Sequence, residues 1–265
     1  AGWRRPNIGL QLLPGDAAGN VHVTGESLGD ASTGSDYVTM KYSPDGTEIW
    51  VRRYNGPDGL DDGPAGIAID AAGNAIVTGQ SHGGADTDLD CATVKYSPDG
   101  TELWVRRYNG PGNLGDAPTG ITIDVSGNVL VTGESRNDAA TNFGSATVKY
   151  SPDGTELWVQ RDNGVGGPNS GPCGIELDAA GNVMVAGRCS GNYGAAKLDP
   201  GGTLLWAQSY NGPGSKSESA LALVLDASGN ALVTGKSEGP GTRLDYATVK
   251  YDPDGRELWA RRWDG

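Results

Sequence analysis

The chain has 265 residues and a formal net charge of −13. Binding to nucleic acid through its phosphates needs a basic surface, so this charge argues against that class of partner. No apolar run approaches the roughly 20 residues that cross a bilayer as a helix. The 44 glycines predict many tight turns.

One segment recurs five times along the chain. It is marked by Asp-x-x-Gly-Asn, by a Lys, and by a Trp that follows Leu or Ile, and the steps between the Asp residues are 54, 54, 54 and 48. The Asp residues are Asp16, Asp70, Asp124, Asp178 and Asp226; the Lys residues are Lys41, Lys95, Lys149, Lys197 and Lys250; the Trp residues are Trp50, Trp104, Trp158, Trp206 and Trp259. Three markers with one period indicate tandem repeats.

Each copy reads as four short strands, because its segments are rich in Val, Ile, Thr and aromatic residues and none keeps a helical period. In the second copy the strands are expected at 66–69, 75–78, 91–96 and 102–108. The third strand alternates, with Ala92, Val94 and Tyr96 on one face and Thr93 and Lys95 on the other. Every copy is therefore expected to form one small sheet.

Two turns determine which strands pair. Asp70-Ala71-Ala72-Gly73 lies between the first and second strands, and Ser97-Pro98-Asp99-Gly100 lies between the third and fourth. Asp or Ser in the first position and Gly in the fourth predict a type I turn closed by a left-handed glycine. Two such hairpins in series give a four-stranded antiparallel meander.

A sheet of this kind has two apolar faces, which only neighbouring copies can cover. We therefore expect an all-β chain that closes as a five-bladed β-propeller, with the repeated Trp between blades. The chain is interpreted as one domain, 1–265, with blades at 9–56, 57–110, 111–164, 165–212 and 213–265. Gly2-Trp3-Arg4-Arg5 is similar to the end of a fourth strand, so a piece of a longer array is the alternative.

The segments Asp-x-x-Gly-Asn-x-x-Val-Thr-Gly, Ala-Thr-Val-Lys-Tyr-Ser-Pro-Asp-Gly and Leu-Trp resemble the bacterial β-propeller repeat known as SBBP. The resemblance covers nearly all of residues 9–265. It implies a propeller and a secreted or cell-surface, extracytoplasmic setting in bacteria. It implies no particular reaction, because a fold does not determine a function.

Variable loops on a constant frame are the usual place for function in repeat proteins. Here the connections after the second and fourth strands vary, whereas the turns after the first and third strands barely change. The variable loops after the second strands are 26–36, 80–90, 134–144, 188–194 and 236–245. Function is therefore expected on the face that carries these loops.

A Tyr-Asn-Gly segment ends three of the repeats, at Tyr54 and Asn55, at Tyr108 and Asn109, and at Tyr210 and Asn211. An aromatic ring beside an amide suits contact with a sugar or peptide, and repetition would add multivalency. The alternative is that Tyr ends the fourth strand and Asn-Gly begins a turn.

Asp86, Asp88 and Asp90 alternate in one variable loop, which is a weak calcium candidate because Ca²⁺ prefers several oxygen ligands. A solvated acidic loop is the alternative, and no other cofactor is expected. His22 and His82, the two histidines, are too few for a transition-metal centre.

Cys173 and Cys189 flank the first hairpin of the fourth copy at similar distances from its turn, so a disulfide between them is one hypothesis and two buried thiols the other. Cys91 is expected to be a passive free thiol.

The preferred hypothesis is a non-catalytic binding or scaffold module that presents its loops to a glycan, a peptide or a protein. It would act as a monomer or as part of a larger assembly. One alternative is a carbohydrate-active hydrolase with two unlike carboxylates at the central axis. The other is a structural spacer in a larger assembly.

Overall fold

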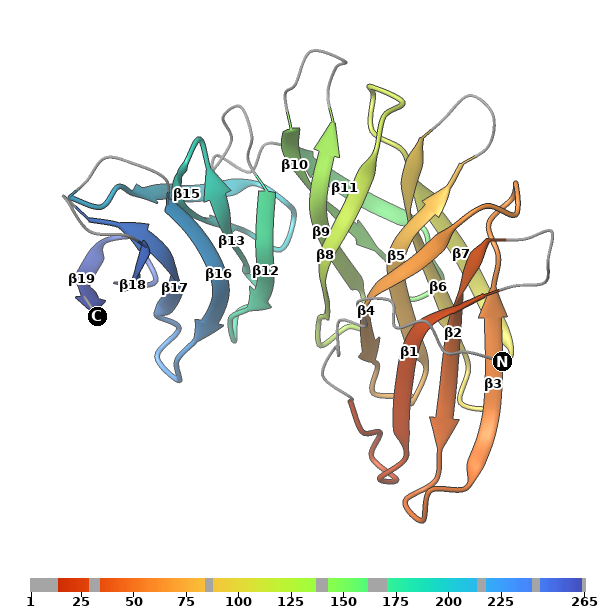
Figure 1. Ribbon diagram of the computed structural model, residues 1–265. Coiled ribbons are helices and arrows are strands. Elements are labelled where there is room, and N and C mark those ends of the chain that lie inside the picture. Colours follow the sequence, from red (N-terminus) through yellow and green to blue (C-terminus); the bar gives the residue numbers. More distant parts are fainter. Residues whose placement is uncertain are drawn as a thin grey trace.

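The computed structural model describes residues 14–28, 34–83, 88–136, 143–161, 171–213, 218–239 and 244–263. These residues form five antiparallel sheets, numbered first to fifth along the chain (Figure 1). Within the described residues the first sheet has three strands and each of the others has four. The expected first strand of the first copy ends just before Asp16 and lies largely outside the described residues, although Gly15 forms an isolated antiparallel bridge with Val21.

The strands follow one another in simple order within every sheet. The first and second sheets contain β1 (Val21–Leu28), β2 (Ser35–Tyr42), β3 (Glu48–Tyr54), β4 (Asp62–Ile69), β5 (Ala75–His82), β6 (Leu89–Tyr96) and β7 (Glu102–Tyr108). The third and fourth contain β8 (Asp116–Ile123), β9 (Val129–Arg136), β10 (Phe143–Tyr150), β11 (Glu156–Arg161), β12 (Gly171–Leu177), β13 (Val183–Cys189), β14 (Asn192–Leu198) and β15 (Leu204–Tyr210). The fifth contains β16 (Glu218–Leu225), β17 (Ala231–Glu238), β18 (Leu244–Tyr251) and β19 (Glu257–Trp263).

The two predicted turn types are confirmed. In the second sheet, the N–H of Gly73 donates to the carbonyl of Asp70 at 2.9 Å, and the N–H of Gly100 donates to the carbonyl of Ser97 at 2.8 Å. Both glycines are left-handed, with φ of 81° and 83°. The Asp70 carboxylate accepts from the backbone N–H of Asn74 at 2.9 Å and from its side chain at 2.7 Å, so this turn is also held by its Asp and Asn side chains.

The strands at the variable-loop end are longer than expected. β4 begins at Asp62 instead of residue 66, β5 runs to His82, and β6 begins at Leu89. Pairing continues through Asp62, Ser81 and Asp90, which lie side by side across the three strands. These polar residues are poor strand formers, but all three are buried, so packing decides their conformation.

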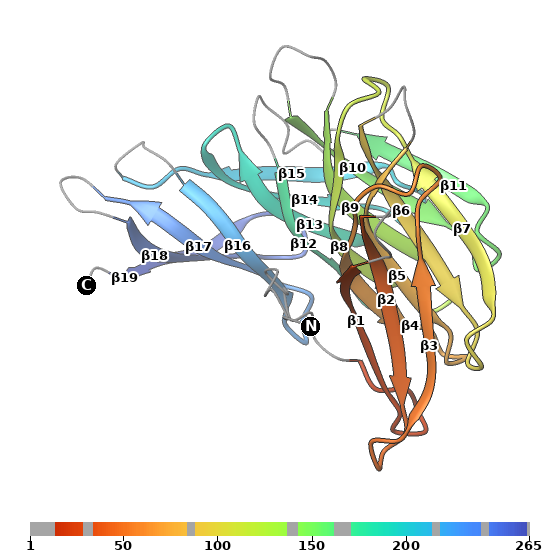
Figure 2. The ribbon, with the colours of Figure 1, turned by 45° about the vertical axis from the view of Figure 1, so that its right-hand side comes forward.

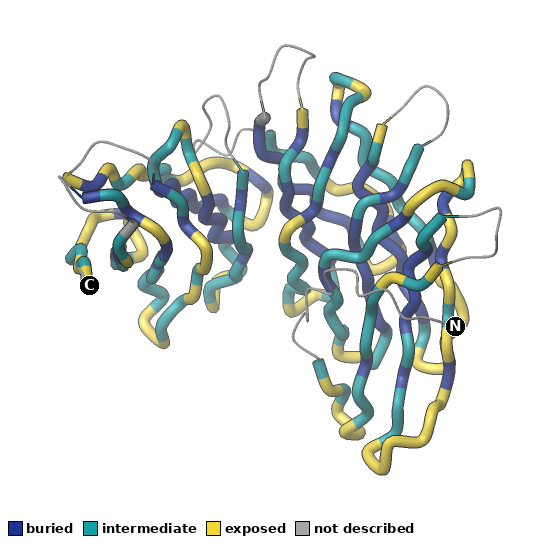
Figure 3. Tube along the Cα trace, viewed as in Figure 1, coloured by how far each residue is buried: buried dark blue, intermediate teal, exposed yellow. Residues whose placement is uncertain are grey.

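The core lies between successive sheets. In one cluster, Tyr37, Trp50 and Tyr54 of the first sheet pack against Ala92, Val94 and Tyr96 of the second. The predicted alternation of the third strand is thus confirmed, because Lys95 on the opposite face reaches the third sheet. Figure 3 shows the same distribution, with buried residues where sheets face one another and exposed residues in the turns.

The five sheets form an arc in chain order. Strands of each sheet pack against the next, from β1 on β4 to β12 on β16. The first and fifth sheets lie at opposite ends of the array in both views (Figures 1 and 2). Five propeller-type sheets are therefore present, whereas the expected closure of the ring is not seen among the described residues. No helix in the described part of the chain is long and apolar enough to cross a bilayer.

Candidate functional site

A polar network recurs at the variable-loop end of the sheets. In the second sheet, Arg107 donates to Ser81 at 2.6 Å and pairs with Asp90 at 3.0 Å. In the fifth, Arg262 donates to Ser237 and pairs with Asp245 at 2.8 Å. Ser81, Asp90 and Ser237 are buried, so the Arg side chains neutralise carboxylates that water does not reach freely.

Three buried acids begin the first strands of the second, third and fifth sheets. Asp62, Asp116 and Glu218 accept a backbone N–H from Gly56, Gly110 and Gly212 at 2.6, 2.7 and 3.1 Å. Burial raises the pKa of Asp116, although hydrogen bonds from Ser135 and Gly110 oppose that shift. Each acid holds the link that enters its sheet, which is a structural role.

The Tyr residues predicted to contact a ligand lie between sheets instead. The Tyr54 hydroxyl accepts from Arg107 of the next sheet at 3.0 Å, and the Tyr108 hydroxyl accepts from Arg161. Tyr54 is buried in the core cluster of the first and second sheets, and Tyr210 packs in the core cluster of the fourth and fifth. The accompanying Asn55 and Asn211 are exposed, whereas Asn109 is half-buried and donates to Asn113 at 3.1 Å.

The fourth sheet departs from this pattern. By strand register, Cys189, Asn192 and Ser209 occupy the positions of Ser81, Asp90 and Arg107. The Arg–Ser–Asp network is therefore replaced by neutral side chains. On the neighbouring position of the second strand, Arg188 stands where the preceding sheets have Glu26, Gln80 and Glu134.

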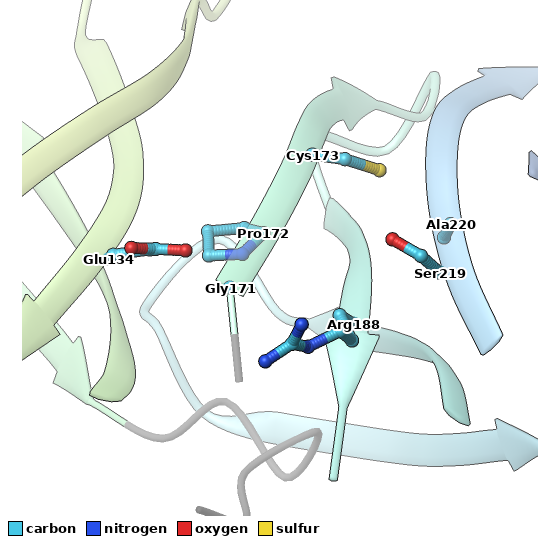
Figure 4. Close-up of a pocket in the computed structure, with 7 residues that line it drawn as sticks. All are labelled: Glu134, Gly171, Pro172, Cys173, Arg188, Ser219 and Ala220. Carbon is cyan, nitrogen blue, oxygen red and sulfur yellow. The ribbon is translucent and has the colours of Figure 1, made fainter. Parts of the chain in front are cut away.

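A cavity of about 350 Å³ lies next to these changed residues of the fourth sheet, between the third, fourth and fifth sheets. Its walls come from β9, β12, β13 and β16 (Figure 4). Arg188, Cys173 and Ser219 surround one space, and Glu134 lies on the far side of Pro172 from Ser219. The lining residues are Glu134, Gly171, Pro172, Cys173, Arg188, Ser219 and Ala220.

Small residues on the first strands make room for this cavity. Glu134 lies against Gly171 of the next sheet, where a Cβ atom would collide with the carboxylate. Cys173 occupies the β-bulge between Pro172 and Gly174, which turns its side chain toward the fifth sheet. The same bulge occurs in β4, β8 and β16. The bulge thus belongs to the repeat, and the thiol is particular to the fourth copy.

The chemistry of the cavity is that of a polar binding site. A carboxylate and a guanidinium flank Gly171 and Pro172, and a hydroxyl faces them from the fifth sheet. Burial raises the pKa of the Cys173 thiol to about 11, so this group is a neutral thiol at physiological pH. The cavity therefore offers opposite charges and a hydroxyl, and no activated nucleophile at Cys173.

The predicted calcium candidate does not form a cluster among the residues that can be placed. Asp86 lies outside the described residues, Asp88 is exposed, and Asp90 is buried against Arg107. Within the described residues, no three His, Cys, Asp or Glu side chains gather closely enough to hold a metal ion. His22 is buried next to the Trp50 ring, and burial lowers its pKa, so it is a packing residue.

The structure does not contain the disulfide suggested by the spacing of Cys173 and Cys189. None of the three cysteines forms a disulfide. The bulge at Cys173 moves this residue out of pairing with β13, and Gly174 is the residue opposite Ala186. Sequence spacing from the turn does not reveal a bulge, which is why the two positions seemed matched. Cys91 is buried and free, as expected.

No protein-family model matches the sequence, and no curated protein matches it. Solved structures match at the level of fold. A protein of unknown function from Bacteroides caccae is 15% identical with a TM-score of 0.54, over 98% of this chain and 83% of the other. A protein from Lactobacillus plantarum is 17% identical with a TM-score of 0.61, over 94% and 69%. The fold is of the propeller type.

Reasoning from sequence did not single out Glu134, Arg188 or Ser219, although Glu134 and Arg188 begin two of the variable loops on which function was expected. A signal was nevertheless present, because aligning the repeats by their Gly residues puts Arg188 where the earlier copies have Glu or Gln. Ser219 stands likewise where Gly63 and Gly171 stand in other copies. This position is acidic or neutral in the first three copies and basic in the last two, as Arg188 and Lys236, so the repeated frame does not require one charge there.

Proposed function

We propose that this chain is a non-catalytic binding module, built as a five-bladed propeller, that takes a polar ligand in the cavity between its third, fourth and fifth sheets. The observation that carries this proposal is the placement of Glu134 and Arg188 around a cavity of about 350 Å³. Ligand pockets typically measure roughly 300–1,000 Å³. The frame on either side is repetitive and structural, and the charged cavity occurs where the repeat changes.

The lining favours a ligand that carries a carboxylate together with hydroxyl or amino groups. A guanidinium binds a carboxylate through two parallel hydrogen bonds, which fix its orientation. Glu134 then suits an amino or hydroxyl donor, and Ser219 a further hydroxyl. Acidic sugars and the carboxyl ends of short peptides both have this chemistry, in agreement with a glycan or peptide ligand.

Glycoside hydrolysis finds less support in this cavity. That reaction uses two carboxylates about 5–10 Å apart. Glu134 is the one carboxylate among the described residues that line the cavity. The arrangement there suits recognition of a ligand better than cleavage of a glycosidic bond.

The binding proposal is tested by screening the full chain against acidic glycans and short peptides and measuring each hit by calorimetry. Arg188→Ala should weaken binding of a hit at least tenfold, since a charge-assisted hydrogen bond contributes about 1.5–3 kcal/mol. Lys236→Ala is the matched control, because Lys236 holds the same register position in the fifth sheet and does not line the cavity. Equal loss in both variants, or no hit in the screen, would contradict the proposal.

We also infer that the repeats are of the SBBP type and that the protein works outside the cytoplasm. The repeated Asp-x-x-Gly-Asn and Lys-Tyr-Ser-Pro-Asp-Gly segments support this inference. Fractionation of cells that make the protein naturally, followed by immunodetection, should find it in the secreted or surface fraction. Recovery from the cytosol would contradict it.

A further inference from the structure

The four junctions between successive sheets share the same pair of hydrogen bonds, which we call the latch. The Trp indole N–H and the Lys ammonium of one sheet donate to the same carbonyl, that of the Pro in the last turn of the next sheet. At the first junction, Trp50 and Lys41 donate to Pro98 at 3.1 and 3.3 Å. The other three latches are Trp104 and Lys95 on Pro152, Trp158 and Lys149 on Pro200, and Trp206 and Lys197 on Pro253, all at 3.0–3.2 Å.

The Trp ring also covers the left-handed glycine of the turn that it binds. A Cβ atom at Gly100, Gly154, Gly202 or Gly255 would come within 2.6–2.9 Å of that ring. All four glycines are buried. Each turn therefore offers one carbonyl and one flat, side-chain-free surface to the sheet before it.

The first sheet has the same turn, and none of the described residues packs on it. Gly46 has a φ of 84°, as its counterparts do, yet it is exposed and has nothing within 4 Å of its Cβ position. On the adjoining face, Val21, Val23, Met40 and Tyr42 are only half-buried, whereas their counterparts in the second sheet, Ala75, Val77, Val94 and Tyr96, are fully buried. Among the described residues, no sheet packs on this face in the way that one packs on the same face of each later sheet.

The fifth sheet has the same donors, and among the described residues no turn of a following sheet lies against them, although Lys250 still pairs with Asp226 at 2.7 Å. The Trp259 indole N–H makes no hydrogen bond within the described part of the chain. The Lys250 side chain is 22% exposed, against 3–7% for its four counterparts. Tyr246 is 63% exposed, whereas Tyr37 and Tyr193 at the same register position are 1% exposed. Tyr246 also packs on Trp263, which is 65% exposed.

We propose that the free face of the fifth sheet binds the free face of the first sheet in the same chain, with Trp259 and Lys250 donating to the carbonyl of Pro44. The Trp259 ring then covers Gly46, and Tyr246 and Trp263 are buried against the first sheet. This inference rests on the propeller of the proposed function and specifies the contact that closes it. In the structure the two faces are apart (Figure 2), and closure joins them by rotation of the sheets about their junctions.

The first sheet of the same chain is the favoured partner for the free face of the fifth sheet, for two reasons. The two faces are complementary in the same sense as each existing junction. The fifth sheet carries the Trp and Lys donors, as each earlier sheet does at its junction, and the first sheet carries the acceptor turn, as each following sheet does. A tether within one chain also gives an effective concentration in the millimolar range, which a second copy at ordinary concentrations does not reach.

The test is a cysteine cross-link in the full chain. At the first junction, the Arg52 guanidinium donates to the carbonyl of Asp99 at 3.5 Å. Closure places Arg261, the counterpart of Arg52, at Asp45 in the same way. The variant with Arg261→Cys and Asp45→Cys should therefore be joined by a bifunctional thiol reagent whose reach matches that of an arginine side chain, and Arg52→Cys with Asp99→Cys is the matched positive control.

Peptide mapping and light scattering identify the product. A 45–261 link in a monomer supports the proposal. A link found only in dimers assigns the faces to a second copy and overturns it, as does failure to link where the 52–99 pair links fully. If the 45–261 pair does not link but the chain still binds a ligand, closure alone is rejected. If the pair links but the screen finds no ligand, the binding proposal alone is rejected.

A second measurement does not depend on cross-linking. Gly46→Ala and Gly100→Ala introduce the same backbone strain, because both positions have φ near 84°. If Trp259 covers Gly46, the two variants should lower the melting temperature equally. A clearly smaller loss for Gly46→Ala would show that nothing lies against this turn and would overturn the proposal.

Discussion

The Lys–Asp pair inside each sheet holds its first turn to its third strand. In the second sheet, Lys95 lies 2.9 Å from Asp70 and both side chains are buried. Lys95 also donates to the carbonyl of Pro152 in the next sheet. One ammonium group therefore joins a turn, a strand and a neighbouring sheet, so its removal affects all three.

Replacing Lys95 with Met should destabilise the chain by about 3 kcal/mol, because it leaves the buried Asp70 carboxylate without its cation. Urea denaturation followed by Trp fluorescence measures the loss. Lys236→Met is the control, since Lys236 is exposed and lies outside the latch. Equal stability of the Lys95→Met variant and the parent would show that the pair contributes nothing net.

The same pairs predict loss of stability in acid. Burial raises the pKa of Asp70, Asp124 and Asp178, but hydrogen bonds from the neighbouring Asn and Lys outweigh it, so each pKa lies below its ordinary value. A group whose pKa is lowered by folding stabilises the fold above its unfolded pKa, and this contribution disappears as the pH falls. The melting temperature should therefore drop below about pH 4. A melting temperature unchanged between pH 7 and pH 3 would contradict this.

At the scale of elements, the Trp on the fourth strand is the main contact between one sheet and the next. Its ring fills the junction and its N–H binds the Pro carbonyl, so shape and hydrogen bonding act at one place. Trp104 is buried, packs against Tyr150 with ring centroids 6.2 Å apart, and donates to Pro152 at 3.1 Å.

Two substitutions of Trp104 separate these contributions. Trp104→Phe keeps a ring and loses the hydrogen bond, which should cost about 1–2 kcal/mol, whereas Trp104→Ala should cost about 3–5 kcal/mol. Both are measured as changes in the free energy of unfolding in urea. If Phe cost as much as Ala, the indole N–H rather than the ring would dominate the junction.

Much of the structure at the scale of strands and turns could be predicted from the sequence. The Asp-x-x-Gly-Asn and Ser-Pro-Asp-Gly turns, the alternation of Ala92 to Tyr96 and the place of the Trp all depend on local chemistry, and the structure confirms them. The extra strand residues did not follow, because Arg107, distant in the sequence, holds Ser81 and Asp90, and Asp62 accepts the backbone N–H of Gly56. The cavity around Arg188 was missed for a similar reason, since it joins three sheets.

At the scale of the whole molecule, the main contacts of each sheet within the described residues are with its neighbours in the arc. Stability in such arrays is approximately a sum of local and nearest-neighbour contributions. Damage at one junction should therefore loosen the sheets on one side of it before the rest unfolds. The junction between the fourth and fifth sheets is the best place to see this.

Trp206→Ala removes the latch on Pro253 and should make the fifth sheet the first part to be cut in limited proteolysis. Mass spectrometry should find early cleavage sites within 213–265 and a longer-lived N-terminal fragment. Trp50→Ala, at the opposite end, should instead shift early cleavage toward the first sheet. The same early sites in both variants would mean that the sheets unfold as one unit.

The latch also has a direction, since donors always sit on one copy and the acceptor on the copy that follows. Gain or loss of a whole 54-residue unit would thus leave every remaining boundary chemically unchanged. A gene encoding this chain can lengthen or shorten by unequal recombination without needing compensating substitutions. Such modular growth accounts for the near-identity of the second and third copies, in which residues 92–105 and 146–159 are identical.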